Sequence, residues 1–251
     1  MGNDCLDSAE EKRRLEEYAK VYFDEISYGI EQKVHILTAE YILSHIKPDI
    51  LELGCGNGTW TRMILEKHSH VDVVDASPLL LDSIKKEHGP RVDCYHSLFE
   101  DFEPATSYET VLLTGTLHHV ADPVLILSRV KTWMKASGRL LVVVPNALSL
   151  HRRLGKTMHL ITDLTEISQL GYQQGHRRVY TPDALRSDIR SAGLTLESEQ
   201  GLFLKPFSNN LLENLPDNIV KGLFDLSLEM PAEYGTLLFF VCSKSDSGRR
   251  A

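Results

Sequence analysis

The sequence lacks the features of a secreted or membrane-spanning chain. It contains no apolar run of about eighteen residues, the length that a helix needs to cross a bilayer. Residues 1–6 have neither the basic region nor the apolar core of a signal peptide, and Leu6 stands where a myristoylation signal has Ser or Thr. We therefore expect a cytoplasmic protein with no membrane partner.

Cysteine and positive charge are also scarce. The four cysteines (Cys5, Cys55, Cys94 and Cys242) are scattered, with no C-x-x-C pair and no histidine at metal-ligand spacing. This predicts reduced thiols and no metal site. Lys and Arg number 27 against 35 Asp and Glu, which gives a net charge of −8. No nucleic-acid partner is therefore expected.

Internal repeats and Pro- or Gly-rich linkers are absent as well. The 251 residues, 42% of them hydrophobic, suffice for one large α/β domain, which we expect over residues 1–244. Within this domain, residues 1–47 read as a helical N-terminal region and residues 146–180 as an insertion. Residues 245–251 have the composition of a disordered tail.

Glycines at alternate positions follow an apolar run near residue 50. Residues 49–53 lead into Gly54, Gly56 and Gly58, after which residues 60–65 have a helical pattern. This predicts a strand that turns sharply into a helix. Glycine allows the backbone conformation of such a turn, and its missing Cβ lets a ligand lie against the main chain.

A second strand, residues 71–75, ends in Asp75. In open α/β sheets, a glycine-rich first turn with an acid at the tip of the next strand binds an adenosine-type cofactor, and the acid accepts from the ribose hydroxyls. The dinucleotide fingerprint G-x-G-x-x-G needs a third glycine where this chain has Thr59. That departure disfavours an NAD-dependent oxidoreductase, which stays a rival interpretation.

The pattern E-x-G-x-G-x-G at 52–58 resembles the first motif of class I S-adenosylmethionine-dependent methyltransferases, and the resemblance extends over about residues 45–243. It implies a Rossmann-like α/β fold with seven mostly parallel strands, the last one antiparallel between the fifth and sixth. It also implies that the N-terminal helices form a lid and that the insertion caps the substrate. The implied cofactor is S-adenosylmethionine, which leaves as S-adenosylhomocysteine.

Periodicity and turn residues place the other elements. Strands are expected at 49–53, 70–75, 91–96, 108–113, 139–145, 194–204 and 236–241. Helices are expected at 7–20, 34–46, 60–65, 77–88, 122–135, 181–192 and 208–230. Pro48 and Gly138 are expected to end helices.

The resemblance assigns the cofactor contacts residue by residue. They are Glu52, Gly54, Cys55, Gly56, Asn57, Gly58, Asp75, Ala76, Ser97, Leu98, Phe99, Thr114, Gly115 and, from the lid, Tyr28. Family members often carry an acid for the adenine amino group near Ser97, and Glu100 lies slightly too late for that role. The alternative for the aromatic residues around Tyr28 is that they only pack the lid on the sheet.

The segment Leu-His-His-Val-Ala-Asp-Pro at 117–123 resembles the loop that lies beneath the sulfonium in the quinone-biosynthesis-like branch of the class. One of its two histidines is expected to cap backbone carbonyls and the other, with His119 favoured, to face the ligand. A base near neutral pH helps a hydroxyl acceptor, and histidine is suited to it. The catalytic candidates are His118, His119, His151 and His176, with Tyr180 a weaker one.

Positive charge gathers on the insertion. Residues 151–180 carry five Lys and Arg against Asp163 and Glu166, an excess of +3 in an acidic chain. Guanidinium groups bind phosphate or carboxylate in two places at once, so an anionic acceptor is expected; the alternative is a solvated basic face. The substrate-binding candidates are Asn146, Arg152, Arg153, Arg177 and Tyr180.

These observations favour a methyltransferase for oxygen or nitrogen of a small anionic acceptor. Residues 146–151 and 175–180 loosely resemble bacterial enzymes that modify sugars or surface-polysaccharide precursors, so a sugar, a nucleotide sugar or a phosphorylated metabolite is the expected acceptor class. A methyltransferase for quinone or lipid intermediates, which needs an apolar mouth, is one alternative. A non-catalytic cofactor-binding module is another. The chain is expected to be a monomer or a homodimer.

Overall fold

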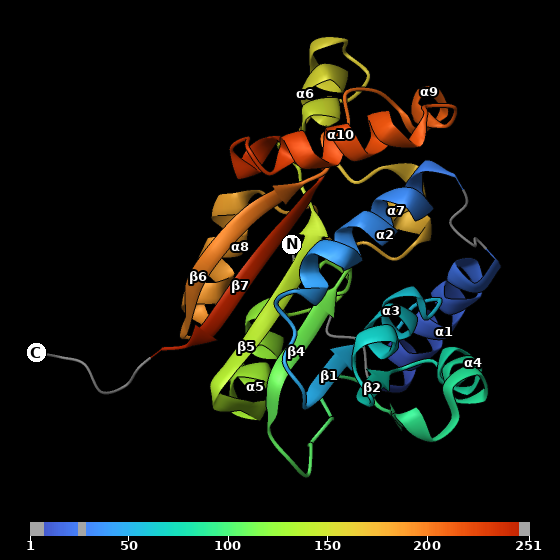
Figure 1. Ribbon diagram of the computed structural model, residues 1–251, viewed down its shortest axis with the longest axis vertical. Helices are drawn as coiled ribbons and strands as arrows, with labels where there is room; N and C mark the ends of the chain where they lie inside the picture. The colour runs from blue at the N-terminus through green and yellow to red at the C-terminus, as the bar shows by residue number, and fades with distance from the viewer. Residues whose placement is uncertain (1–7, 25–28, 246–251) are drawn as a thin grey trace, which may run out of the picture.

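The computed structural model describes residues 8–24 and 29–245 as three layers, a seven-stranded sheet with helices on both faces (Figure 1). The strands are β1 Ile50–Leu53, β2 Val71–Asp75, β3 Val92–His96, β4 Tyr108–Thr114, β5 Met134–Pro145, β6 Leu194–Leu202 and β7 Leu237–Lys244. Their order is β3-β2-β1-β4-β5-β7-β6. Neighbours among β1 to β5 pair in parallel, and β7 is antiparallel to both β5 and β6. The predicted sheet is confirmed.

Two apolar clusters fill the space between the sheet and its helices. The helices are α1 Ser8–Asp24, α2 Ile30–Leu43, α3 Thr59–Lys67, α4 Pro78–His88, α5 Pro123–Trp133, α6 Leu150–Thr157, α7 Gln169–Gln173, α8 Pro182–Ser191, α9 Asn209–Leu212 and α10 Asp217–Ser227. Helices α2, α3, α4 and α10 contribute to the cluster on one face, and α5 and α8 to the cluster on the other. Because both faces are covered, residues 111–113 of β4 and 140–144 of β5 are continuous apolar runs.

Local sequence sets the starts of three helices. The side chains of Ser77, Asp122 and Thr181 accept hydrogen bonds from backbone N–H groups in the first turns of α4, α5 and α8, and each is followed by proline. Such caps satisfy donors that have no partner inside the helix, and proline at the first position loses no hydrogen bond. These predicted starts are confirmed.

Helix α5 ends five residues before Gly138, the residue that was expected to stop it. Strand β5 already begins at Met134, so this expectation was wrong. A Cβ at position 138 would lie 2.7 Å from the carbonyl oxygen of Tyr108. Glycine is therefore needed there because two strands approach closely.

Other boundaries shift where proline or tertiary packing intervenes. The expected helix 208–230 is divided into α9 and α10, with Pro216 as the N-cap of α10. Helix α1 runs to Asp24 and α2 begins at Ile30, so the aromatic stretch between the two expected helices is partly helical. Tyr28 lies outside the described residues. No helix in residues 8–24 and 29–245 is long and apolar enough to cross a membrane.

The first and last residues of the insertion are joined by an isolated β-bridge at the end of the sheet. Asn146 and Tyr180 pair in parallel just after β5, and the chain between them forms α6 and α7. Figure 1 shows α6, α9 and α10 at one end of the molecule. The insertion thus emerges from the carboxyl end of a central strand, the edge where sheets of this kind bind ligands.

Candidate functional site

A cavity of about 430 Å³ opens where the parallel strands end. One part of its lining, here called the strand wall, consists of residues that follow β1, β2, β3 and β4: 54–57, 59–60, 75–76, 97–100 and 114–116. The rest, here called the outer wall, comes from α1, α2, the insertion, Leu80 and residues 118–120, 143–145, 203–209 and 236–237. Segments far apart in the chain therefore meet in one site.

The strand wall brings together most of the predicted cofactor residues. On it lie Gly54, Cys55, Gly56, Asn57, Asp75, Ala76, Ser97, Leu98, Phe99, Thr114 and Gly115. Gly56 has a φ of 50°, and a Cβ there would meet nothing within 4 Å, so this part of the turn faces open space. Gly58, in contrast, faces α4: a Cβ there would lie 2.4 Å from Cδ1 of Ile84. Glycine at position 58 therefore lets the turn pack against α4 on the side away from the cavity.

Asp75 joins the glycine turn to the end of β2. Its Oδ2 accepts from the backbone N–H of Cys55 at 3.1 Å, and its Oδ1 accepts from the N–H of Ser77 at 2.8 Å. Burial raises the pKa of Asp75, while these N–H groups oppose that rise. The Cys55 thiol also donates to Oδ2, at 3.5 Å, so Oδ1 is the oxygen better able to accept a further hydrogen bond from a ribose.

Glu52 lies behind the turn and not on the cavity wall. The Thr61 hydroxyl donates to its Oε2 at 2.6 Å, and its Oε1 is buried without a partner among the described residues. Burial, with a smaller contribution from Asp75, raises the pKa of Glu52 to about 8. The structure therefore places this predicted cofactor residue beneath the site, in a largely protonated form at neutral pH.

The end of the site near β3 contains an acid that the sequence analysis set aside. Ser97 turns its hydroxyl to the carbonyl oxygen of Leu98, at 2.8 Å. Glu100 lines the cavity, and burial raises the pKa of its carboxyl. Residues 97–100 all line the cavity, so the position of Glu100 along the chain did not exclude it from the site as expected.

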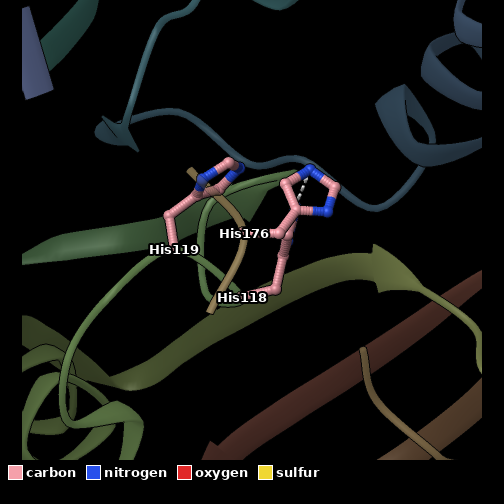
Figure 2. Close-up of side chains that lie close together, drawn as sticks. All are labelled: His118, His119 and His176. Atoms are coloured by element: carbon pink, nitrogen blue, oxygen red, sulfur yellow. Dashed lines mark hydrogen bonds between the residues drawn. The ribbon is translucent and has the colours of Figure 1, made fainter. Parts of the chain in front are cut away.

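Three histidines, here called the histidine cluster, meet on the cavity wall (Figure 2). His118 and His119 follow β4, and His176 comes from the insertion. Nε2 of His118 and Nε2 of His176 share a hydrogen bond at 3.3 Å, and the ring of His119 bonds to the backbone of Gly175. Both loop histidines line the cavity, whereas only one was expected to face it.

Burial keeps the histidine cluster neutral. It lowers the pKa of His119 to about 3 and that of His176 to about 4, and it lowers the pKa of His118 well below its usual range. For His118 and His119 the neighbouring rings add to the effect. A base with so low a pKa accepts a proton poorly at neutral pH. His151, on α6, does not line the cavity.

The arginines of the insertion bind protein groups. Arg178 donates to the carbonyl oxygens of Leu117, Val120 and Ala121, at 3.3, 2.6 and 2.9 Å, and so clamps the loop that carries His118 and His119. Arg177 pairs with Glu11 of α1 at 3.0 Å. None of Arg152, Arg153, Arg177 and Arg178 lines the cavity.

The remaining substrate candidates also have internal partners. Arg152 donates to the carbonyl oxygens of Leu164 and Glu166, and Arg153 to that of Leu148 and to the Glu233 carboxylate. The Asn146 amide donates to two carbonyls, of Glu233 and Gly235, and the Tyr180 hydroxyl donates to Asp188 at 2.9 Å. Half-buried guanidinium groups need hydrogen-bond acceptors, and the irregular backbone of the insertion supplies carbonyl oxygens. These arginines therefore hold the insertion together.

The outer wall combines apolar residues with polar and charged ones, and apart from the histidine cluster its residues were not predicted. Its apolar members include Leu15, Ala19, Ile30, Val34, Phe203 and Leu237. Among its charged members is Lys205, whose pKa is lowered by burial while nearby Glu31 opposes the shift. These residues come from separate segments without a common motif, so no pattern in the sequence signals that they meet.

The family follows from a comparison with known proteins. The family model of the methyltransferase domain matches residues 17–199, and the chain belongs to this family. It is an S-adenosylmethionine-dependent methyltransferase. The strand wall fits that cofactor: an open glycine turn, a buried carboxylate and a polar strand exit lie on one cavity. When bound, the cofactor supplies an electrophilic methyl group. The NAD-dependent and non-catalytic alternatives are thereby set aside.

Relatives and solved structures agree with this class. The ubiquinone biosynthesis O-methyltransferase of Xanthomonas axonopodis pv. citri is 26% identical over 72% of this chain and 79% of its own length. The mitochondrial enzyme of that name from Schizosaccharomyces pombe is 24% identical over 72% and 69%.

The folds of two solved structures cover nearly the whole chain. One is the Burkholderia thailandensis 1,6-didemethyltoxoflavin-N1-methyltransferase, with a TM-score of 0.57 and 18% identity over 96% of this chain and 92% of that one. The other is the DhpI–SAM–HEP complex, with a TM-score of 0.60 and 15% identity over 94% and 98%. At these identities the likeness concerns the fold alone.

Proposed function

We propose that this methyltransferase acts on a hydroxyl oxygen of a small apolar acceptor, of the phenol or quinol class. The observation that carries the proposal is the set of apolar side chains on the outer wall, such as Leu15, Val34 and Phe203. The transfer of apolar and aromatic ligands from water to such a lining is favourable. The relatives named for ubiquinone biosynthesis support the same acceptor class.

The anionic sugar acceptor becomes the second candidate. The expectation relied on the arginines of the insertion, and these bind carbonyl and carboxylate groups of the protein itself. Lys205 is the observation that still favours a negative charge on the acceptor, because its ammonium group belongs to the cavity wall.

Helices α1 and α2 are proposed to act as a lid. Glu11, Leu15 and Ala19 of α1 and Ile30 and Val34 of α2 line the cavity, so both helices separate bound ligands from water. Exclusion of water favours methyl transfer over side reactions. The pair between Glu11 and Arg177, half-buried on both sides, would hold the lid against the insertion.

A screen of acceptors tests the proposal. Consumption of the methyl donor is measured with catechols, other simple phenols and quinols. It is measured separately with sugar phosphates and nucleotide sugars. Turnover with phenols and quinols is expected. Turnover only with the sugar derivatives would refute the proposal and restore the anionic acceptor.

Lys205→Met provides a second arm. For a neutral phenol the variant should leave the acceptor KM within about twofold, because no charge-assisted bond is lost. For an anionic acceptor that binds Lys205, the KM should rise by tenfold or more, since a hydrogen bond to a charged group contributes about 1.5–3 kcal/mol. Affinity for S-adenosylhomocysteine serves as the folding control.

A further inference from the structure

The histidine cluster has the spacing of a metal site. Its members offer three ligand nitrogens that all lie within 4.8 Å of one another, and Nε2 of His118 and Nε2 of His176 are 3.3 Å apart. Two nitrogens bound tetrahedrally to one zinc ion at about 2.0–2.1 Å stand roughly 3.3 Å apart. Two of the three rings therefore already have the separation that shared coordination requires, and a ligand nitrogen of His119 lies within 4.8 Å of both.

The rings also lie where an ion in the cavity reaches them. All three line the cavity, and an imidazole nitrogen without a proton binds metals through its lone pair. His118 is 3% exposed, so its ring is shielded from bulk water. The bond between His119 and the Gly175 backbone is of the kind that orients ligating histidines in known metal sites.

The cluster is held in place from outside. Arg178 fixes three carbonyls of the 117–121 loop, and the backbone N–H of Arg177 donates to the carbonyl of His118 at 3.0 Å. The backbone N–H of His176 donates to the Gly171 carbonyl at 2.8 Å. Ligands on a fixed backbone lose little entropy when an ion binds, so these contacts favour coordination.

We propose that His118, His119 and His176 bind one divalent transition-metal ion of the zinc class, with an open coordination position toward the cavity. The cluster contains only imidazoles, which suit zinc, cobalt or nickel, whereas magnesium and calcium prefer oxygen ligands. Three protein ligands with a free position are typical of catalytic zinc sites, and all three residues line the cavity. The sequence analysis predicted no metal, because no two of its spacings matched a known ligand motif.

The role of the ion rests on the proposed function. A hydroxyl bound at the open position would lose its proton to water at a lower pH, because the cation stabilises the oxyanion that stays bound. The imidazoles themselves are poor bases at neutral pH, so the ion would supply the activation that His119 was expected to give.

Cobalt titration of the full chain tests the site. Protein treated with a chelator is titrated with Co²⁺, and the visible absorption of the bound ion is followed. We expect one tightly bound ion, and a loss of affinity in His118→Ala and in His176→Ala of at least about a hundredfold, the upper end of what the loss of an outer partner costs. Binding of S-adenosylhomocysteine checks that the variants fold.

Two histidines outside the cluster provide matched controls. His151→Ala removes another half-buried histidine of the insertion, and His70→Ala disrupts an exposed group with Asp72 and Asp93 that also has metal-like spacing. Both variants should bind cobalt as the unaltered chain does. Loss of the signal in His70→Ala, with the cluster variants unaffected, would overturn the proposal.

X-ray absorption of the zinc-loaded unaltered chain decides the matter if the cluster variants fail to fold. Three imidazole nitrogens and one water oxygen are expected, and a shell without imidazole would refute the site. The proposed metal site and the proposed acceptor class can be refuted independently of each other. A chain that binds S-adenosylhomocysteine and no cobalt lacks the site, whereas one that binds cobalt and methylates no phenol or quinol has another acceptor.

Discussion

The strand wall and the outer wall line one cavity but are built differently. The strand wall consists of short turns directly after β1, β2, β3 and β4, and its contacts are largely backbone groups and one carboxylate. The outer wall consists of helix faces and an insertion, joined by long-range pairs such as Arg177 with Glu11. A cofactor common to a whole family can therefore be bound by the local geometry of strand ends, while the acceptor is bound by the helices and loops that pack above them.

The largest effect is expected on the strand wall, from Gly56→Val. Valine is strained at a φ of 50°, and its branched side chain would occupy the open space in front of the turn. Calorimetry should show that binding of S-adenosylhomocysteine weakens by a hundredfold or more.

Gly89→Val is the matched control for that strain. Gly89 has a φ of 58° and also nothing within 4 Å of a built Cβ, but it does not line the cavity. It should lose stability by a similar amount, about 1–2 kcal/mol, and keep its affinity for S-adenosylhomocysteine. Equal affinity in both variants would mean that the turn at Gly56 does not contact the cofactor.

Asp75→Ala should have the next largest effect, again confined to cofactor binding. The variant removes an acceptor for ribose hydroxyls, and a hydrogen bond to a charged group contributes about 1.5–3 kcal/mol, so affinity should fall more than tenfold. The N–H groups of Cys55 and Ser77 also lose their partner. Asp75→Asn keeps one acceptor and should lose less. Unchanged dissociation constants in both variants would refute the ribose contact.

The sequence predicted the strand wall far better than the outer wall, for a physical reason. Gly54, Gly56 and Asp75 act through backbone geometry and a strand end, which are local and repeat at fixed spacing. The outer wall depends on where α1, α2 and the insertion pack, which is decided by contacts across the whole chain. Composition misled there: Arg178 reads as a ligand for anions and instead clamps three carbonyls.

Arg178→Met tests whether the hydrogen bonds of Arg178 to the histidine loop affect the acceptor and not the cofactor. The loop that carries His118 and His119 should loosen, so kcat/KM for the acceptor should fall by about tenfold, the cost of roughly one hydrogen bond to a charged group. Affinity for S-adenosylhomocysteine should change by less than threefold.

Arg152→Met is the control for that clamp, because Arg152 also donates to carbonyls of the insertion but does not touch the histidine loop. It should affect stability and leave kcat/KM nearly unchanged. Equal losses of kcat/KM in both variants would show that the insertion acts as one unit, and the distinction between the clamps would fail.

Glu52, which does not line the cavity, is expected to affect ligand binding least and to act instead on stability. Its folded-state pKa of about 8 lies above the unfolded value of 4.5, so the folded chain holds a proton that the unfolded chain has released between these pH values. The folded state is therefore favoured at low pH, and the free energy of unfolding should decline as pH rises through this window, by at most about 1.4 kcal/mol per pH unit. Glu52→Gln cannot release a proton, so thermal melts between pH 5 and pH 8 should show the variant gaining stability relative to the unaltered chain as pH rises. A constant difference across that range would mean that Glu52 is ionised in the folded protein, with its charge stabilised by a hydrogen-bond donor such as a water molecule at Oε1.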